Sequence, residues 1–423
     1  MFDFVLRQSR LVDHPDLVDI GVSGGRIAAI APTLPDGPPS RSAKGRLVCG
    51  GFVESHIHLD KACILDRCAI CDGTLREAVT LTAKAKAGFT QEDVYARASR
   101  VVEQAIIHGT TRLRTFVEVD PRAQLRSFEA ILQIKRDYAF AVDIDICAFA
   151  QEGLTQEMET HRLLETALRN GADLVGGCPY QDPKPDQHIR LILDLAERFG
   201  VFAEFHIDFD LEPTGSDMPA LIRETRERGL EGRVAIGHAT KMSAMSPDEF
   251  AGLGRQLSDA GIALTVLPAT DLFLMGREAD RLVPRGVTRA DCLGTLGVTT
   301  AIATNNVLNP FTPYGDASLI RMANLFANVA QLATNEELTD VFAMVTTSPA
   351  RILGRDARVA IGASADLVLI DALDPASAVR EIAQPLAGWK RGVQTFERPT
   401  PVILSADGTQ RASAERRGYP TTS

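Results

Sequence analysis

The feature that most constrains the fold is an alternation of short apolar segments with helical patterns through the middle of this 423-residue chain. Each segment is a near-continuous run of apolar residues, as expected for strands of a parallel sheet that are buried on both faces. A doubly wound open sheet would alternate in the same way, but eight repeats favour closure into an α/β barrel of the (β/α)8, or TIM, type. The expected strands are residues 51–58, 111–119, 141–150, 172–178, 201–207, 233–238, 262–267 and 298–304.

The two ends of the chain differ from this middle part. Short β-type runs broken by turn signals fill residues 1–50, and similar runs return at residues 365–371 and 401–404. We therefore expect one small β-sandwich built from both chain termini, residues 1–50 and 355–423. It would flank a barrel of residues 51–354.

Composition and charge exclude several classes of protein. The chain has 45 basic and 55 acidic residues and a net charge of -10, which argues against binding to nucleic acid. No apolar run approaches the roughly 20 residues of a membrane span, and the amino-terminal residues are not those of a signal peptide. Seven scattered cysteines indicate a reducing compartment. We expect a cytoplasmic homo-oligomer that binds a small-molecule substrate and neither nucleic acid nor a membrane.

Several expected strands end in residues that can perform chemistry. His56 and His58 are two positions apart, so their side chains share one face of a strand. His206 and His238 end later strands, and the carboxyl ends of barrel strands meet at one end of the barrel. A pair of hydrogen-bonded core histidines is the alternative, but half of the eight histidines lie at these ends. We predict that His56, His58 and His206 bind one divalent ion, Zn²⁺, Fe²⁺ or Mn²⁺.

Residues 51–61 (GFVESHIHLDK) resemble the first-strand signature of the amidohydrolase superfamily, in particular the branch of bacterial cytosine deaminase and N-isopropylammelide isopropylaminohydrolase. Further similar stretches follow in the family's order at residues 109–115, 148–153, 174–179, 206–208, 306–311 and 313–315. The resemblance implies a metal-dependent hydrolytic barrel flanked by a β-sandwich.

The resemblance also implies roles for individual residues. His56, His58 and His206 would be ligands of the ion, and His238 would polarise the bond under attack. Gln151 would hydrogen-bond the amide edge of the substrate. We expect Lys61, Phe209 and Asn306 to contact the substrate as well.

Two positions depart from the family pattern. The family has a weakly metal-binding, proton-carrying aspartate on strand 8, where this chain has Asn305. Cytosine deaminases have a general acid–base glutamate three residues after the strand 5 histidine, where this chain has Phe209. An amide oxygen can bind a metal or hold a water molecule, but an amide does not accept a proton at neutral pH. The titratable residues that remain nearby are Asp60, Lys61, Asp208 and Asp210. Because Asp208 shares the face of His206 by strand parity, it is our first choice as the proton carrier.

Two weaker features are interpreted conservatively. Lys84, Lys86 and Arg97 lie on helical patterns, where charged residues most often form a solvated face. Residues 271–277 follow the seventh expected strand, and they form either a loop that covers the substrate or an ordinary packed loop.

The predicted activity is hydrolysis of a carbon–nitrogen bond in a small nitrogen heterocycle, most simply a deamination of the cytosine deaminase type. The ion would lower the pKa of water from about 15.7 towards about 7, which makes hydroxide available at neutral pH. His238 would stabilise the developing charge, and Asn305 would hold the water molecule. Two alternatives stay open: an amidase or N-dealkylating amidohydrolase acting on a cyclic amide or substituted triazine, and a catalytically degenerate barrel that binds a small molecule.

Overall fold

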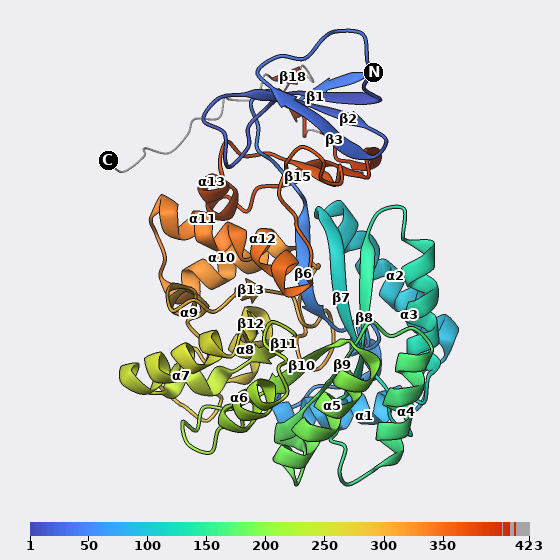
Figure 1. Ribbon diagram of the computed structural model, residues 1–423, viewed down its shortest axis with the longest axis vertical. Helices are drawn as coiled ribbons and strands as arrows, with labels where there is room; N and C mark the ends of the chain where they lie inside the picture. The colour runs from blue at the N-terminus through green and yellow to red at the C-terminus, as the bar shows by residue number, and fades with distance from the viewer. Residues whose placement is uncertain (400, 407–409, 412–423) are drawn as a thin grey trace.

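The computed structural model describes residues 1–399, 401–406 and 410–411. Its centre is one parallel sheet in which each strand pairs with the next along the chain (Figure 1). A parallel bridge between Ile57 and Asn305 brings the end of this sheet back to its beginning. The predicted TIM barrel is therefore confirmed. Its strands are β6 (Phe52–Ile57), β7 (Thr110–Glu118), β8 (Asp143–Ala150), β9 (Leu174–Gly177), β10 (Phe202–Ile207), β11 (Val234–His238), β12 (Ala263–Val266) and β13 (Thr300–Ile302).

Helices surround the barrel and connect its strands (Figure 1). Thr90 and Ser246 cap two of them by accepting hydrogen bonds from the backbone N–H groups three residues further along the chain. The helices are α1 (Leu75–Lys86), α2 (Gln91–Ile107), α3 (Arg126–Asp137), α4 (Glu159–Arg169), α5 (Pro185–Phe199), α6 (Met218–Glu227), α7 (Pro247–Asp259), α8 (Pro268–Leu274), α9 (Ala290–Thr295), α10 (Leu319–Ala330), α11 (Asn335–Ala343) and α12 (Thr347–Ile352), with 3-10 turns η1 (Leu65–Arg67), η2 (Pro179–Gln181) and η3 (Thr240–Ala244). None of the described helices combines the length and the apolar character that a membrane crossing requires.

The chain termini form two further four-stranded sheets, as predicted. One consists of β1 (Phe4–Ser9), β2 (Val18–Ser23), β3 (Arg26–Ala31) and β4 (Ser40–Ser42). The other consists of β5 (Val48–Cys49), β14 (Leu367–Ile370), β15 (Pro385–Lys390) and β16 (Val393–Glu397). Helix α13 (Pro375–Arg380) follows β14, and a short hairpin, β17 (Ile403–Leu404) with β18 (Gln410–Arg411), lies near the end of the chain.

One apolar cluster joins the two terminal sheets. Leu6 and Ile20 of the first sheet pack in it with Leu367 and Trp389 of the second. The ring of Trp389 stacks on that of Phe4, with 5.5 Å between the ring centroids. The boundaries of the predicted domain stay a prediction, and its residues 400, 407–409 and 412–423 lie outside the described residues.

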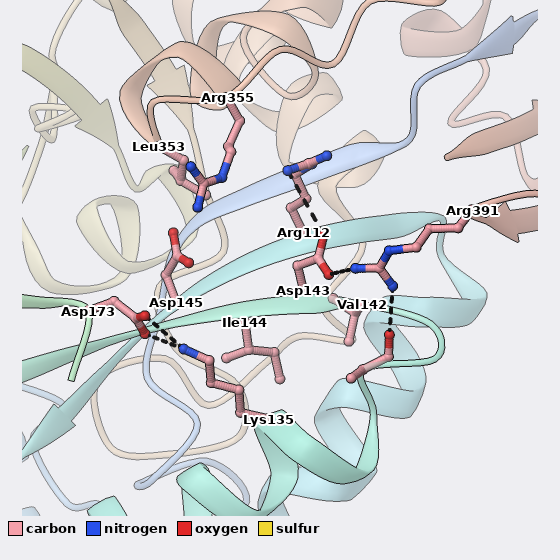
Figure 2. Close-up of a pocket in the computed structure, with 11 residues that line it drawn as sticks. Arg112, Lys135, Val142, Asp143, Ile144, Asp145, Asp173, Leu353, Arg355 and Arg391 are labelled. Atoms are coloured by element: carbon pink, nitrogen blue, oxygen red, sulfur yellow. Dashed lines mark hydrogen bonds and ion pairs between the residues drawn. The ribbon is translucent and has the colours of Figure 1, made fainter. Parts of the chain in front are cut away.

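A charged cavity of about 360 Å³ lies at the amino-terminal end of barrel strands β7 to β9. Figure 2 shows that its charges face one another, with Lys135 paired to Asp173 at 2.6 Å and Arg391 paired to Asp143 at 2.5 Å. In barrels of this type the amino-terminal end contributes to stability and the opposite end carries catalysis. The chemistry is therefore expected at the other end.

Deletion of residues 1–45 tests whether the termini form one folding unit. It removes Phe4, Leu6 and Ile20, so Leu367 and Trp389 lose their partners and expose apolar surface and strand edges. We expect the shortened protein to aggregate, as measured by its soluble fraction and by gel filtration. Deletion of residues 2–3 is the control, since it removes no member of this cluster. A soluble, monodisperse shortened protein would contradict the prediction.

Candidate metal centre and active site

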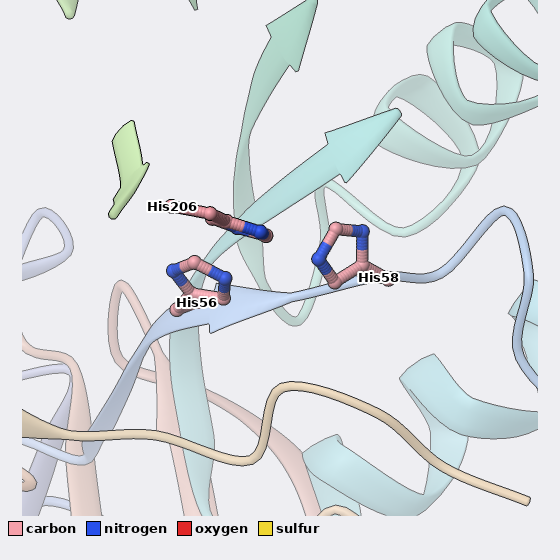
Figure 3. Close-up of side chains that lie close together, drawn as sticks. All are labelled: His56, His58 and His206. Atoms are coloured by element: carbon pink, nitrogen blue, oxygen red, sulfur yellow. The ribbon is translucent and has the colours of Figure 1, made fainter. Parts of the chain in front are cut away.

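The carboxyl ends of the barrel strands bring four histidines together. His56 belongs to β6 and His58 follows it, while His206 belongs to β10 and His238 ends β11. Each of the four is at most 2% exposed. The ring of His206 lies 4.6 Å from that of His56 and 5.2 Å from that of His58, measured between centroids. Figure 3 shows these three rings grouped at the end of β6.

Ring nitrogens of these histidines lie close together, and several of them have no hydrogen-bond partner among the described residues. His56, His58 and His206 each offer a ring nitrogen, and these three atoms lie within 4.8 Å of one another. Nε2 of His56, Nε2 of His206 and Oδ1 of Asn305 are buried and have no hydrogen-bond partner in the described part of the chain. Buried polar atoms are normally paired, so a convergent set of unpaired lone pairs fits a bound divalent ion. The residues present therefore suit the ion that the sequence predicts.

A buried ion pair behind His56 fixes its orientation. Nδ1 of His56 lies 2.9 Å from Oε1 of Glu204, and Arg114 donates to the other carboxylate oxygen at 3.0 Å. The carboxylate accepts a hydrogen bond from Nδ1–H and so leaves Nε2 with the free lone pair, which is how metal-binding histidines are usually held. Burial lowers the pKa of His56 to about 4 although Glu204 opposes this, and burial also lowers the pKa of His58 and His206. All three rings are therefore neutral at pH 7.

A small cavity opens beside the histidines. It has a volume of about 10 Å³, roughly the space of one water molecule. Lys61 lies in its wall and donates to Glu118 at 2.7 Å and to Gln151 at 3.0 Å. All four residues predicted to contact a substrate meet here. The lining consists of His58, Lys61, Gln151, Tyr180, His206, Phe209, His238, Thr270, Asn305, Asn306 and Phe311.

Asp208 does not face this cavity, so the parity argument for it is wrong. Strand β10 ends at Ile207, and Asp208 adopts a left-handed backbone with φ of 52°. Its carboxylate accepts hydrogen bonds from Ser216 at 2.5 Å and from the backbone N–H of Asp217 at 3.0 Å. The side chain therefore anchors the loop before α6 and does not serve the reacting centre.

Asp271 was missed as a partner of the site. It lies on α8, one helical turn beyond β12, and places Oδ1 at 2.7 Å from Nδ1 of His238. Burial raises the pKa of this carboxyl group, whereas the neighbouring His238 opposes the rise. The sequence analysis placed Asp271 directly after the seventh strand, at the catalytic end of the barrel. This position was the signal from which a role at the site could have been predicted.

Two of the three helical charges that the sequence expects in solvent, Lys86 and Arg97, are buried. Lys86 is 2% exposed and contacts Glu118 at 2.7 Å, together with Asp120 and Glu152. These three carboxylates could by their spacing hold a metal ion, but the Lys86 ammonium occupies the place between them. Burial alone raises the pKa of Glu118, yet the Lys61 and Lys86 charges lower it to about 2. Glu118 is therefore an ionised anchor for Lys61.

Arg97 is likewise directed inward. It donates to the backbone oxygens of Asp60 at 3.0 Å and of Ala62 at 2.6 Å. These residues follow the predicted ligand pair His56 and His58 directly. The arginine thus holds the segment that leaves the site. The expectation of a solvated face is wrong for Lys86 and Arg97, whereas Lys84 is exposed as expected.

A model of the amidohydrolase family matches residues 47–395. The chain belongs to this family. It is 29% identical over 413 residues to N-isopropylammelide isopropyl amidohydrolase of Pseudomonas sp. (strain ADP), covering 92% of this chain and 96% of that protein. It is 28% identical over 360 residues to pterin deaminase of Rhizobium rhizogenes (strain K84 / ATCC BAA-868), covering 84% and 82%. The crystal structure of 5-methylcytosine deaminase from Klebsiella pneumoniae liganded with 5-fluorocytosine matches with a TM-score of 0.91 and 28% identity, covering 95% and 100%.

This amidohydrolase is a hydrolytic enzyme that acts on carbon–nitrogen bonds, as the sequence predicts. Members of the superfamily use a divalent metal ion, and the three histidines fit such a site. The predicted resemblance to the branch of cytosine deaminase and N-isopropylammelide isopropylaminohydrolase is also confirmed.

The two departures from the family pattern lie side by side around His238. Asn305 donates from Nδ2 to Thr270 at 3.0 Å, which fixes its other atom, Oδ1, as the unpaired one. Phe209 packs on the imidazole of His238 with 3.9 Å between centroids. In this amidohydrolase an amide and an aromatic ring thus surround the histidine where the family resemblance implies two carboxylates.

Replacement of His206 by alanine tests the metal centre. It removes one of three convergent nitrogens, so we expect the metal content of the purified protein to fall well below one ion per chain. The measurement is elemental analysis by mass spectrometry. His188→Ala is the matched control, because His188 is also fully buried but pairs with Asp182 outside the cluster. Full metal content in His206→Ala would show that the assignment is wrong.

Glu204→Gln tests the carboxylate behind His56. A glutamine side chain has one oxygen and one N–H₂ end, so it cannot accept from both His56 and Arg114. Loss of such an orienting partner typically lowers metal affinity by about 10- to 100-fold. We expect a loss of this size in competition with a chelator, while an unchanged affinity would assign Glu204 to folding alone.

Proposed function

We propose that this enzyme is a mononuclear metal-dependent deaminase of a small nitrogen heterocycle. The observation that carries the proposal is the convergence of ring nitrogens of His56, His58 and His206. It lies beside a cavity that is lined by Asn305, His238 and Lys61. Three convergent ring nitrogens of this kind fit a bound divalent ion. The related proteins add the substrate class, because their names specify N-isopropylammelide, pterin and 5-methylcytosine.

The proposed ligands are His56, His58 and His206, with Oδ1 of Asn305 as a further ligand or as the holder of a water molecule. When bound, the ion acts as a Lewis acid and lowers the pKa of water towards about 7. His238 presents Nε2 to the cavity, where it accepts a proton from the attacking water and then, as Nε2–H, hydrogen-bonds the atom on which negative charge develops. Because Asn305 cannot accept a proton and Asp208 faces away, we assign the movement of the proton to the same Nε2.

Lys61 and the aromatic rings define the proposed substrate. Two of the three N–H groups of Lys61 are used by Glu118 and Gln151, so one remains for an acceptor atom of the substrate. Phe209 and Phe311 contribute flat apolar surfaces to the same cavity. A flat ring with an oxo group or an unprotonated ring nitrogen satisfies both features, as a heterocyclic amide does.

Release of an alkylamine in place of ammonia is the second candidate. Phe209 is the observation that favours it, because an apolar ring beside His238 accommodates an N-alkyl substituent better than a carboxylate does. The similarity to N-isopropylammelide isopropyl amidohydrolase agrees with this candidate. The two candidates differ only in the group that leaves.

We also place the enzyme in the cytoplasm. All seven cysteines are free thiols in the structure, which agrees with a reducing compartment. The predicted homo-oligomer stays a prediction that a mass measurement in solution tests.

A product screen separates these candidates. The zinc-loaded protein is incubated with aminopyrimidines, aminotriazines, their N-alkyl derivatives and pterins, and the release of ammonia and of alkylamine is measured separately. We expect turnover of at least one amino-heterocycle that is lost with a chelator and restored by Zn²⁺. Ammonia as product supports the deaminase, and alkylamine supports the second candidate. Tight binding of these rings without any product would support the degenerate binding barrel and overturn both proposals.

A further inference from the structure

His238 is held from behind by a carboxylate that the family resemblance does not explain. Oδ1 of Asp271 lies 2.7 Å from Nδ1 of His238, and Oδ2 accepts a hydrogen bond from the backbone N–H of Leu267 at 3.3 Å. Asp271 is 0% exposed and His238 is 2% exposed. Both oxygens of the carboxylate therefore have a polar partner in a fully buried site.

Other groups restrain the remaining sides of the ring. Phe209 packs against its face, with 3.9 Å between the centroids. Nε2 points to the cavity and lies 3.5 Å from Nδ2 of Asn305. The backbone of His238 is also in the left-handed region, with φ of 69°. The ring is thus fixed in one orientation, with Nδ1 towards Asp271 and Nε2 towards the reacting centre.

We propose that Asp271 is a positioning residue that holds His238 as the Nδ1–H form and turns its Nε2 lone pair into the cavity. A neutral imidazole has one N–H and one lone pair, and a carboxylate, which only accepts, selects the form with the proton on Nδ1. The inference rests on the proposed function, in which Nε2 of His238 serves the substrate. It adds a residue of α8 to the site.

The second oxygen of Asp271 makes Asp271→Asn a sharp probe. If the oxygen of the introduced amide accepts from Leu267, its N–H₂ group faces Nδ1 of His238 and forces the opposite form, with the proton on Nε2. If the amide is reversed, its N–H₂ group meets the N–H of Leu267, and two buried donors are opposed. Either way the substitution changes hydrogen bonding while it preserves the size of the side chain.

A second buried histidine–aspartate pair provides the comparison. Nδ1 of His188 lies 3.0 Å from Oδ2 of Asp182, and His188 is 0% exposed. Its Nε2 abuts Gly177, where a Cβ atom would approach to 2.0 Å. His188 does not line the cavity. This pair is therefore structural, and Asp182→Asn is a matched control for damage to a buried pair of this kind.

The first test is spectroscopic and needs no substrate. Zinc-loaded protein labelled with ¹⁵N-histidine contains only eight labelled side chains, and the signals of His238 are assigned by their loss in His238→Gln. We expect the wild-type ring to carry its proton on Nδ1 and the ring in Asp271→Asn to carry it on Nε2. A wild-type ring with the proton on Nε2 overturns the proposal, and this result stands whether or not Asp271→Asn folds.

The second test is kinetic. Asp271→Asn is expected to lower kcat by roughly 10²- to 10⁴-fold, as loss of a general acid or base does, with little change in KM or zinc content. Asp182→Asn is expected to lower the melting temperature and to change kcat far less. Wild-type kcat in Asp271→Asn, or equal losses of kcat in both variants, would overturn the positioning role. If no heterocycle is turned over by the wild type, the proposed function fails while the ¹⁵N measurement still decides the state of His238.

Discussion

The closure of the barrel between its first and last strands is the constraint on which the site depends. The N–H of Asn305 donates to the carbonyl of His56, and the N–H of His58 donates to the carbonyl of Asn305, each at 2.8 Å. These two bonds join segments far apart in the chain and complete the ring of strands. Because they involve His56, His58 and Asn305, which are proposed to serve the metal centre, the contacts that close the barrel also hold these site residues together. His206, from β10, completes the group of three convergent ring nitrogens.

Periodicity and chain position were sufficient to predict the barrel strands and the end at which the histidines meet. They did not predict the directions and contacts of individual polar side chains. All eight barrel strands and the common end of His56, His58, His206 and His238 followed from apolar runs and from the geometry of parallel strands. The direction of Asp208 did not, because parity applies only while the backbone stays extended. Asp208, His238 and Asn305 all have left-handed backbones at or just beyond the ends of their strands. Such conformations are uncommon for residues other than glycine, and surrounding structure must hold them, so a strand pattern does not reveal them.

Contacts between distant segments of the chain explain why the sequence did not predict the environment of Lys86 or the roles of Asp271 and Glu204. Lys86 sits on a helix whose pattern is that of a solvated face, yet Glu118 from β7 and Glu152 from beyond β8 draw its charge inside. Charged groups are buried only when they are paired, and the partners are 32 and more positions away in the chain. Asp271 and Glu204 were missed for the same reason, since each is identified only by the histidine that it contacts. The carboxylates that orient the site are therefore a product of the tertiary fold.

The distribution of negative charge around the site explains how an amide can stand at position 305. In the proposed site, three neutral imidazoles and one neutral amide would leave the ion without any anionic ligand, whereas an aspartate at 305 would cancel part of its charge. Sets of three neutral histidines are sufficient in zinc enzymes to lower the pKa of water to about 7, so electrophilic power is retained. What the amide removes is a proton acceptor. The buried carboxylates Glu204 and Asp271 instead contact the far nitrogens of His56 and His238, at 2.9 and 2.7 Å. The two carboxylates thus lie one imidazole ring away from the proposed reacting atoms. There they orient the rings of His56 and His238 without neutralising the charge of the ion.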